Sequence, residues 1–225
     1  MKPSLSSPQR GDSGLLDLLV MLIAVAIVAM VGYAYLNGRA QPRSKRINCI
    51  NQLKCIGLSA RLWSGDNGDK MPGQVSTNAG GMMELVAGGS TVPFFAVMSN
   101  EIATPKILIC LADSERRWAT NFSSLTDSNI SYFIVPEADE TQPNLWLSGD
   151  RNLATNNTPL KPGLLTTPTN RVLSWTAQMH SHQGNISFAD GSVQQFTDVS
   201  LRTSATNTLS TWLATTNTPF RLAIP

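Results

Sequence analysis

The stretch LLVMLIAVAIVAMVGYAYL, residues Leu18–Leu36, decides how the rest of the chain is interpreted. Its nineteen residues carry no charge, and most of them are large and apolar. A helix needs about 20 apolar residues to cross the hydrocarbon core of a bilayer. The stretch therefore predicts a membrane-spanning helix close to the N-terminus.

The borders of this stretch favour a retained helix over a cleaved secretory signal. Asp17 precedes it, and it is followed by Asn37 and a basic cluster, Arg39, Arg43, Lys45 and Arg46. A secretory apolar region is typically about 7–15 residues long, and no clean A-x-A cleavage site follows this one. We therefore expect a leader-like segment at 1–14, a long helix at 15–65 with its membrane part at 18–36, and a globular head at 66–225.

The composition narrows the classes of partner. The chain has 225 residues, a formal net charge of +2 and 14% charged residues. So small a positive net charge does not support nucleic-acid binding. After the N-terminal helix there is room for one domain with its own core. This layout favours a head tethered to a membrane over a free soluble enzyme.

The helical pattern continues beyond the apolar stretch. Pro42 predicts a kink or break near Gln41–Pro42, because proline lacks the N–H that a helix interior uses. After it, two apolar rows recur at helical spacing on nearly opposite sides. The first row is Cys49, Leu53, Ile56, Ala60 and Trp63, and the second is Ile47, Leu58 and Leu62. We expect one of the two rows to pack against the head. The other row then either contacts a second partner or is buried on another side of the same domain.

The remaining residues predict a β-rich head with short strands. Strands are expected at 107–110, 130–135 and 172–176, where β-branched and aromatic residues are frequent. Two alternating runs flank Asp190-Gly191 and predict a hairpin with a type I′ turn. A short helix is expected at 205–213, and irregular exposed loops at 77–90, 137–141 and 154–169. The predicted fold class is α+β, with a long N-terminal helix packed on an antiparallel sheet.

Four segments carry a family resemblance. Residues 15–20 (LLDLLV) are similar to the prepilin-type start G-F-T-L-I-E-L-L-V, and residues 49–57 (CINQLKCIG) to C-x-N-x-L-K-x-I-G. Residues 105–113 (PKILICLAD) are similar to P-K-x-L-x-C-P-x-D, and His180 is followed by nine residues and then Asp190-Gly191. Together they resemble the type IV pilin-like superfamily, and within it a bacterial group of prepilin-type proteins with an H-x9-DG motif near the C-terminus.

The resemblance implies a structural protein and not an enzyme: a pilin-like or pseudopilin-like subunit of a type IV pilus or a type II secretion filament. Its partners would be the membrane, like subunits or other pilin-like proteins, and a prepilin peptidase. The head would lie outside the cytoplasmic membrane, although the basic residues after the apolar stretch would by themselves place it in the cytoplasm. The second hypothesis is a membrane-anchored extracytoplasmic binding module that does not polymerise.

One departure from the family pattern bears on processing. In the family, a peptidase cuts after a glycine and the new N-terminus is methylated. If Asp17 stands for the family's glutamate, that glycine should fall at position 12, which is Asp12. Either the cut follows Gly11 with altered spacing, or the leader is retained. Asp17 would pair with a neighbouring subunit's N-terminal amine, as the resemblance implies, or it marks the headgroup-level end of the span.

The three cysteines allow one disulfide. Cys49 lies on the first helical row and Cys110 ends a predicted core strand, so both should face the helix–sheet interface, whereas Cys55 points elsewhere. Cys49–Cys110 is therefore the favoured pair, and closing about 60 residues would stabilise the fold by roughly 4 kcal/mol. Such a bond requires an oxidising compartment. The alternative is three buried thiols in a reducing cytosol.

Two groups of residues raise the question of a metal. On a strand, His180 and His182 would place both imidazoles on one face, and with Asp190 they could bind zinc. Asp190 is already explained by the turn, however, and no further cluster completes a catalytic set, so no metal or catalytic site is expected.

Calcium is the one cofactor that the acidic residues could bind. Its possible ligands are Asp66, Asn67 and Asp69, and the run Glu137, Asp139 and Glu140. Calcium takes about six to eight oxygen ligands, and no EF-hand spacing is present. A plain turn and a solvated acidic loop are expected instead, with no cofactor.

Overall fold

The computed structural model describes residues 13–166, 172–216 and 218–225. The chain divides into two compact units, Met1–Arg43 and Ser44–Pro225. Helix α1 (Ser13–Asp66) supplies the helical part of the first unit and the first element of the second. The fold class is α+β, as predicted, with a long N-terminal apolar helix and antiparallel sheets.

The prediction of a helix break at Pro42 is wrong. Residues on both sides of Pro42 are helical, and α1 is assigned as a helix through it. Helix propagation is cooperative, and the segments before and after Pro42 are each long enough to be helical on their own. One missing backbone hydrogen bond is therefore tolerated here.

Two antiparallel sheets make up the second unit. The larger sheet has the strand order β5-β9-β1-β2-β7-β8, and the smaller sheet has the order β4-β3-β6. The strands are β1 (Tyr132–Ile134), β2 (Trp146–Asp150), β3 (Leu153–Thr155), β4 (Thr158–Pro159), β5 (Gly163–Thr166), β6 (Leu173–Trp175), β7 (Gln183–Phe188), β8 (Val193–Thr197) and β9 (Arg221–Ile224).

Helices and 3-10 turns fill the rest of this unit. The further α-helices are α2 (Val92–Val97), α3 (Ser99–Ile102) and α4 (Asp198–Thr215). The 3-10 segments are η1 (Pro72–Gln74), η2 (Thr77–Ala79), η3 (Met83–Gly88), η4 (Pro105–Leu108), η5 (Phe122–Ser124) and η6 (Asp127–Asn129).

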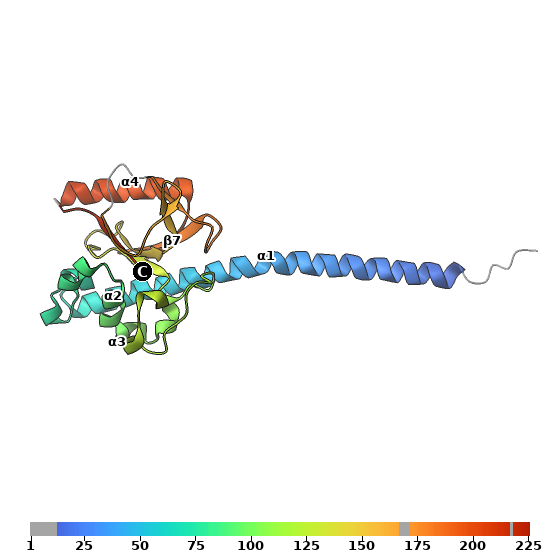
Figure 1. Cartoon of the computed structure of the whole chain (residues 1–225), viewed down its shortest axis with the longest axis horizontal. Helices are drawn as coiled ribbons and strands as arrows, with labels where there is room; N and C mark the ends of the chain where they lie inside the picture. The colour runs from blue at the N-terminus through green and yellow to red at the C-terminus, as the bar shows by residue number, and fades with distance from the viewer. Residues whose placement is uncertain (1–12, 167–171, 217) are drawn as a thin grey trace, which may run out of the picture. The chain divides into compact units, whose positions relative to one another are not determined.

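Within the second unit, α1 and α4 cover opposite faces of the larger sheet (Figure 1). Tyr132 of β1 donates its hydroxyl hydrogen to Gln52 Oε1 of α1 at 2.8 Å. Trp146 of β2 donates from Nε1 to Ser204 Oγ of α4 at 3.0 Å. Because side chains alternate between the faces of a strand, each strand contributes to both interfaces.

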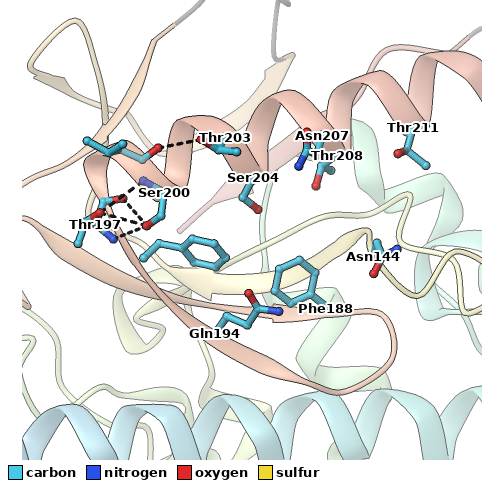
Figure 2. A pocket seen from close by; sticks show the side chains of 12 residues that line it. Asn144, Phe188, Gln194, Thr197, Ser200, Thr203, Ser204, Asn207, Thr208 and Thr211 are labelled. Atoms are coloured by element: carbon cyan, nitrogen blue, oxygen red, sulfur yellow. Dashed lines mark hydrogen bonds between the residues drawn. The ribbon is translucent and has the colours of Figure 1, made fainter.

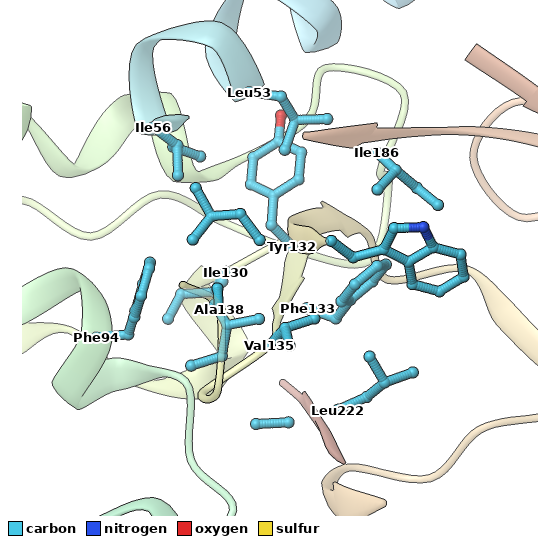
Figure 3. Close-up of a cluster of buried hydrophobic side chains, with 14 of the residues drawn as sticks. Leu53, Ile56, Phe94, Ile130, Tyr132, Phe133, Val135, Ala138, Ile186 and Leu222 are labelled. Carbon is cyan, nitrogen blue, oxygen red and sulfur yellow. The ribbon is translucent and has the colours of Figure 1, made fainter. Parts of the chain in front are cut away.

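The first apolar row of α1 is the part of the helix that enters the core. All five of its members are buried: Cys49, Leu53, Ile56, Ala60 and Trp63. Figure 3 shows Leu53 and Ile56 pointing from α1 toward Tyr132 and the other buried side chains of the sheet. The predicted docking of this row on the head is confirmed.

The second apolar row of α1 stays outside the core. Ile47, Leu58 and Leu62 are 51%, 58% and 54% exposed. The alternative that α1 is buried on two sides of one domain is therefore wrong. In the described head, nothing covers most of these side chains.

The predicted β7–β8 hairpin is present, but its turn differs from the prediction. A type I′ turn would need positive φ at both Asp190 and Gly191. Only Gly191 of the two has it, at +82°. The Gly191 N–H donates to Phe188 O, and the Phe188 N–H donates to Ser192 O, each at 2.9 Å. The connection is thus a three-residue loop in which a turn is followed by a left-handed glycine.

Other local expectations are partly corrected. The strand expected at 107–110 is wrong, because Pro105 starts the 3-10 segment η4 there. The expected loop at 154–169 contains strands, and Asn156 and Asn157, both at positive φ, form the two-residue turn between β3 and β4. The expected loop at 77–90 contains η2 and η3. The helix expected at 205–213 is the longer α4, whose N-cap is Thr197.

At Gly57 the backbone of α1 lies close to the β7–β8 hairpin, and this generates a prediction. A Cβ at Gly57 would lie 2.9 Å from Ser187 Oγ and 3.2 Å from Gly191 Cα, whereas one at exposed Gly65 would meet nothing within 4 Å. Gly57→Leu should lower the free energy of unfolding by about 1–3 kcal/mol through overpacking. Gly65→Leu should leave it unchanged or raise it, because leucine is the better helix former. Denaturant titration of the full-length chain in detergent micelles measures both, and equal effects would contradict the close approach.

Candidate functional site

The apolar part of α1 is a candidate site of membrane insertion. Gly14–Leu36 comprises 23 residues, and its most apolar 18-residue window has a mean hydropathy of 2.8 and is not buried in the structure. It is long and apolar enough to cross a membrane. Asp17 is exposed near the start of this segment, where an ionisable side chain is costly unless paired. The other processing candidates, Gly11 and Asp12, lie outside the described residues.

The predicted disulfide is present. Cys49 of α1 is bonded to Cys110, with their Cα atoms 5.1 Å apart across a sequence separation of 61. Both residues are fully buried. Cys55 is the free cysteine, and it is exposed. The bond fastens α1 to the segment that follows η4.

His180 lies against this disulfide inside a buried polar cluster. Its Nε2 is 3.3 Å from Cys110 Sγ and 3.3 Å from Asp150 Oδ2. Its carbonyl accepts a hydrogen bond from Arg46 Nη2 at 2.9 Å. Asp150 Oδ2 also accepts from the backbone N–H and the side-chain amide of Asn185, at 2.7 and 2.8 Å. The first of the family-motif residues is thus part of the interface between α1 and the sheet.

Burial sets the protonation of this cluster. It raises the pKa of Asp150 from 3.8 to about 7, against the hydrogen bonds from Asn185. It also lowers the pKa of His180 from 6.5 to about 4, and the positive charge of Arg46 adds to this. His180 is therefore neutral near pH 7. A neutral imidazole donates one hydrogen bond and accepts another. His180 can therefore lie between the Asp150 carboxyl and the buried disulfide without carrying a charge.

The cluster is not fully satisfied by protein partners. Within the described residues, Arg46 Nε, Asp150 Oδ1, Asn185 Oδ1 and Ser187 Oγ are buried without a hydrogen-bond partner. A buried polar atom without a partner costs about 1–3 kcal/mol. This face of β2 and β7 is thus less favourable for stability than an apolar face of the same shape would be.

The histidine-based metal set is not assembled. His180 is buried, whereas His182 is exposed, with Nδ1 3.1 Å from Trp175 O. Ser181 and His182 have positive φ, so both histidines precede β7 in a turn and do not share a strand face. Asp190 follows β7 at its other end. The geometry on which the H-x-H idea depended is therefore wrong.

A different group of potential ligands does converge. Cys49, Cys110 and His180 each place one ligand atom within 4.8 Å of the others. The two sulfurs are bonded to each other, and metal binding by cysteine requires the free thiolate. In this oxidised form the group is therefore a disulfide with an adjacent imidazole.

The Asp190-Gly191 turn is tied to α1 by Arg61. Its Nη1 donates to Asp190 O at 3.1 Å, and its Nε donates to Glu140 Oε1 at 2.8 Å. Ser64 Oγ donates to the other oxygen of Glu140 at 2.8 Å. The last two residues of the H-x9-DG motif therefore shape a turn that packs against the helix.

The acidic run considered for calcium, Glu137, Asp139 and Glu140, has protein partners. Asp139 accepts from Gln74 Nε2 at 3.0 Å and from Thr141, and Glu137 forms an ion pair with Arg221. Glu140 is held by the contacts of Arg61 and Ser64 described above. Among the described residues these carboxylates do not form a cluster that could hold a metal ion.

A largely buried ion pair anchors the segment after Cys110. Arg151 donates from Nε and Nη2 to the two oxygens of Asp113, at 2.7 and 2.9 Å. Burial pushes the pKa of Asp113 upward, but the bonds from Arg151 and Ser131 outweigh it and hold that pKa below its usual value. Asp113 is the last residue of the third family-like segment, and its ion pair ties that segment to the end of β2.

Sequence reasoning missed Asp150, Asn185 and Arg151 as partners of the motif residues. Asp150 and Arg151 end β2 and follow it, and Asn185 lies in β7, so only strand pairing brings them to His180 and Asp113. No local pattern marks them. Arg46 had one signal, its place in the basic cluster after the apolar stretch.

Comparison with known proteins identifies no relative. No protein-family model, curated protein or solved structure matches this chain.

The disulfide generates a stability prediction. Replacing Cys49 and Cys110 together by serine should lower the free energy of unfolding by about 2–4 kcal/mol, because the unfolded chain loses a constraint across 61 residues. The variant Cys55→Ser serves as the control and should change it by less than about 0.5 kcal/mol, as exposed substitutions usually do. Denaturant titration in detergent micelles, without reductant, measures both. Equal stability of the double variant and the parent chain would contradict the prediction.

The His180–Asp150 pair generates a pH prediction. The contribution of His180 to the free energy of unfolding is present above pH 6.5 and is lost as the pH falls through its pKa of about 4. The contribution of Asp150 has the opposite sign, being present below pH 3.8 and lost as the pH rises through about 7. In the parent chain, between pH 4 and 6.5, His180 makes stability rise with pH and Asp150 makes it fall, so the two effects oppose each other. In Asp150→Asn, stability should therefore rise over this window, by about 3 kcal/mol at most.

The complementary variant gives the control. His180→Asn removes the histidine and leaves Asp150, so stability should fall over the same pH window. Denaturation midpoints at pH 4.5 and 6.5 measure the two slopes. Slopes of the same sign in both variants would contradict the assignment of protonation states.

Proposed function

We propose that this chain is a pilin-like or pseudopilin-like structural subunit that is anchored by its N-terminal helix and assembles through α1. The carrying observation is the second row of α1: Ile47, Leu58 and Leu62 are all more than half exposed on a helix whose opposite row is buried. An exposed apolar row at helical spacing is a surface for another helix. The four family-like segments support the same function.

The apolar segment of α1 supports anchoring before assembly. Every residue of Gly14–Leu36 is exposed in the structure, so lipid or neighbouring helices must cover it. Asp17 lies at the start of this segment, where pairing with the N-terminal amine of a neighbouring subunit would offset its cost. In this proposal, subunits wait in the membrane and pass into a filament core made of such helices.

The disulfide supports an extracytoplasmic head. Disulfides persist in oxidising compartments and are rare in the cytosol. Cys49–Cys110 lies in the second unit, beyond the apolar segment, so this unit would lie outside the cytoplasmic membrane. The proposed role is structural, and the motif residues His180, Asp190 and Gly191 serve the fold in it.

A second function is favoured by one specific observation. Asp12 stands where the family's cleavage glycine would fall. A chain that keeps its leader would remain in the membrane as an anchored extracytoplasmic binding module and would not polymerise.

The mature N-terminus separates the two functions. Intact mass and N-terminal sequence are measured on the chain extracted from its native membrane. A new N-terminus near Asp12, with or without a methyl group, is expected for the subunit. An intact start at Met1 would contradict processing and favour the anchored module.

Cys55 offers a direct test of assembly. It is exposed on α1 and is the only cysteine outside the disulfide, so a bismaleimide should link it to Cys55 of a neighbouring chain in the membrane. Leu58→Glu combined with Leu62→Glu should reduce the cross-linked dimer at least about tenfold, because each buried leucine contributes about 1.5–3 kcal/mol. Leu213→Glu, an exposed leucine on α4, is the matched control. A parent chain that yields no dimer, or a dimer that the double variant leaves intact, would contradict assembly through this row.

A further inference from the structure

A groove lined by uncharged side chains lies between α4 and the β7–β8 hairpin, on the face of the sheet opposite α1. Its volume is about 630 Å³, within the range typical of small-molecule sites. Figure 2 shows Ser204 and Thr208 on α4 facing Phe188 and Gln194 across it, with Asn144 at one end. It is separate from the second row of α1 and from the buried His180 cluster.

The groove has hydrogen-bonding groups without protein partners. Among the described residues, the side-chain amides of Asn144, Gln194 and Asn207 make no hydrogen bond, and each of the three residues is exposed. Thr208 is only 3% exposed, yet its hydroxyl also makes none. Elsewhere on α4, Thr206 Oγ1 donates to a backbone carbonyl of its own helix at 2.9 Å. The Thr208 hydroxyl lacks such a bond and lines the groove, so it is available to a ligand.

The lining selects an uncharged ligand. All its members are uncharged side chains, mostly hydroxyls and amides. A charged ligand would lose hydration without meeting an opposite charge. Hydroxyls and amides both donate and accept hydrogen bonds, so they match a ligand whose own groups do both.

The floor of the groove is aromatic. Phe188 of β7 and Phe196 of β8 place their ring centroids 6.1 Å apart, and both residues line the groove. An apolar floor below polar walls suits a ligand with C–H faces and a rim of hydroxyls. A peptide would instead require pockets for its side chains, and the only other apolar lining residue is Val199.

We propose that this groove binds a neutral oligosaccharide. The amides of Asn144, Gln194 and Asn207 and the hydroxyl of Thr208 would bond to sugar hydroxyls, and the sugar rings would lie over Phe188. The inference does not depend on the proposed function, because an anchored monomer and an assembled subunit would present the same groove.

Isothermal titration of the full-length chain tests the inference. The protein is held in lauryldimethylamine oxide micelles, because detergents with sugar headgroups would compete. The probes are maltohexaose, cellohexaose, mannohexaose and chitohexaose, with hexagalacturonate as the acidic comparison and a neutral hexapeptide, Ser-Thr-Gly-Asn-Ser-Thr, as the peptide comparison. Saturable binding of at least one neutral oligosaccharide is expected, and none of either comparison ligand.

Two variants and two matched controls locate the site. Thr208→Val and Gln194→Leu should each raise the dissociation constant about 2- to 12-fold, the range for one lost hydrogen bond. Gln194 is exposed, so its variant keeps the test valid even if Thr208→Val fails to fold. Gln195→Leu, on the opposite face of β8, and Thr206→Val, on α4 outside the groove, should leave it unchanged.

Three results would overturn the inference. The first is that no neutral oligosaccharide binds at 1 mM. The second is that the peptide or hexagalacturonate binds as tightly as the best neutral sugar. The third is that sugar binding is unaffected by both groove variants or is weakened equally by the controls. None of these results bears on Cys55 cross-linking, so the failure of the two proposals can be distinguished.

Discussion

The fold of the head depends on the burial of one row of α1 against the larger sheet. Cys49 and four apolar residues of this row are fully or almost fully buried, and Gly57 lets the helix backbone approach the β7–β8 hairpin. The disulfide to Cys110 then holds the helix to a segment 61 residues away. Because the helix must meet the sheet along this row, its other row is left exposed. The surface proposed for assembly is therefore a consequence of how the head packs.

The residues of the family-like motifs serve this interface. His180 links the disulfide to Asp150, Asp113 is held by Arg151, and the Asp190-Gly191 turn is tied to α1 through Arg61. Each of these contacts joins segments far apart in the chain. In this structure the residues of the signature therefore form contacts of the scaffold.

The sheet separates two surfaces with different chemistry. Its α1 side leads to an exposed apolar row suited to another helix, and its α4 side carries a groove of hydroxyls and amides suited to a neutral polar ligand. An apolar row favours association with a like surface, because burial removes it from water. A groove that combines hydroxyls and amides with an aromatic floor favours a small ligand with both polar and apolar surface. The two proposals therefore use opposite faces of one scaffold and do not compete for residues.

The sequence alone determined what depends on periodicity and residue type. It predicted the apolar helix, the buried row of α1, the hairpin around Asp190-Gly191 and the α+β class, because spacings of 3.6 and 2 are written along the chain. It could not place Asp150 beside His180 or form the groove below Thr208, since these neighbours meet only after strands pair and α4 packs. It also misjudged the turn at Gly191 and the 3-10 segment after Pro105, where single hydrogen bonds decide between similar backbones. Local pattern therefore determined the elements, and long-range packing decided which polar groups were buried together and which were left open to solvent.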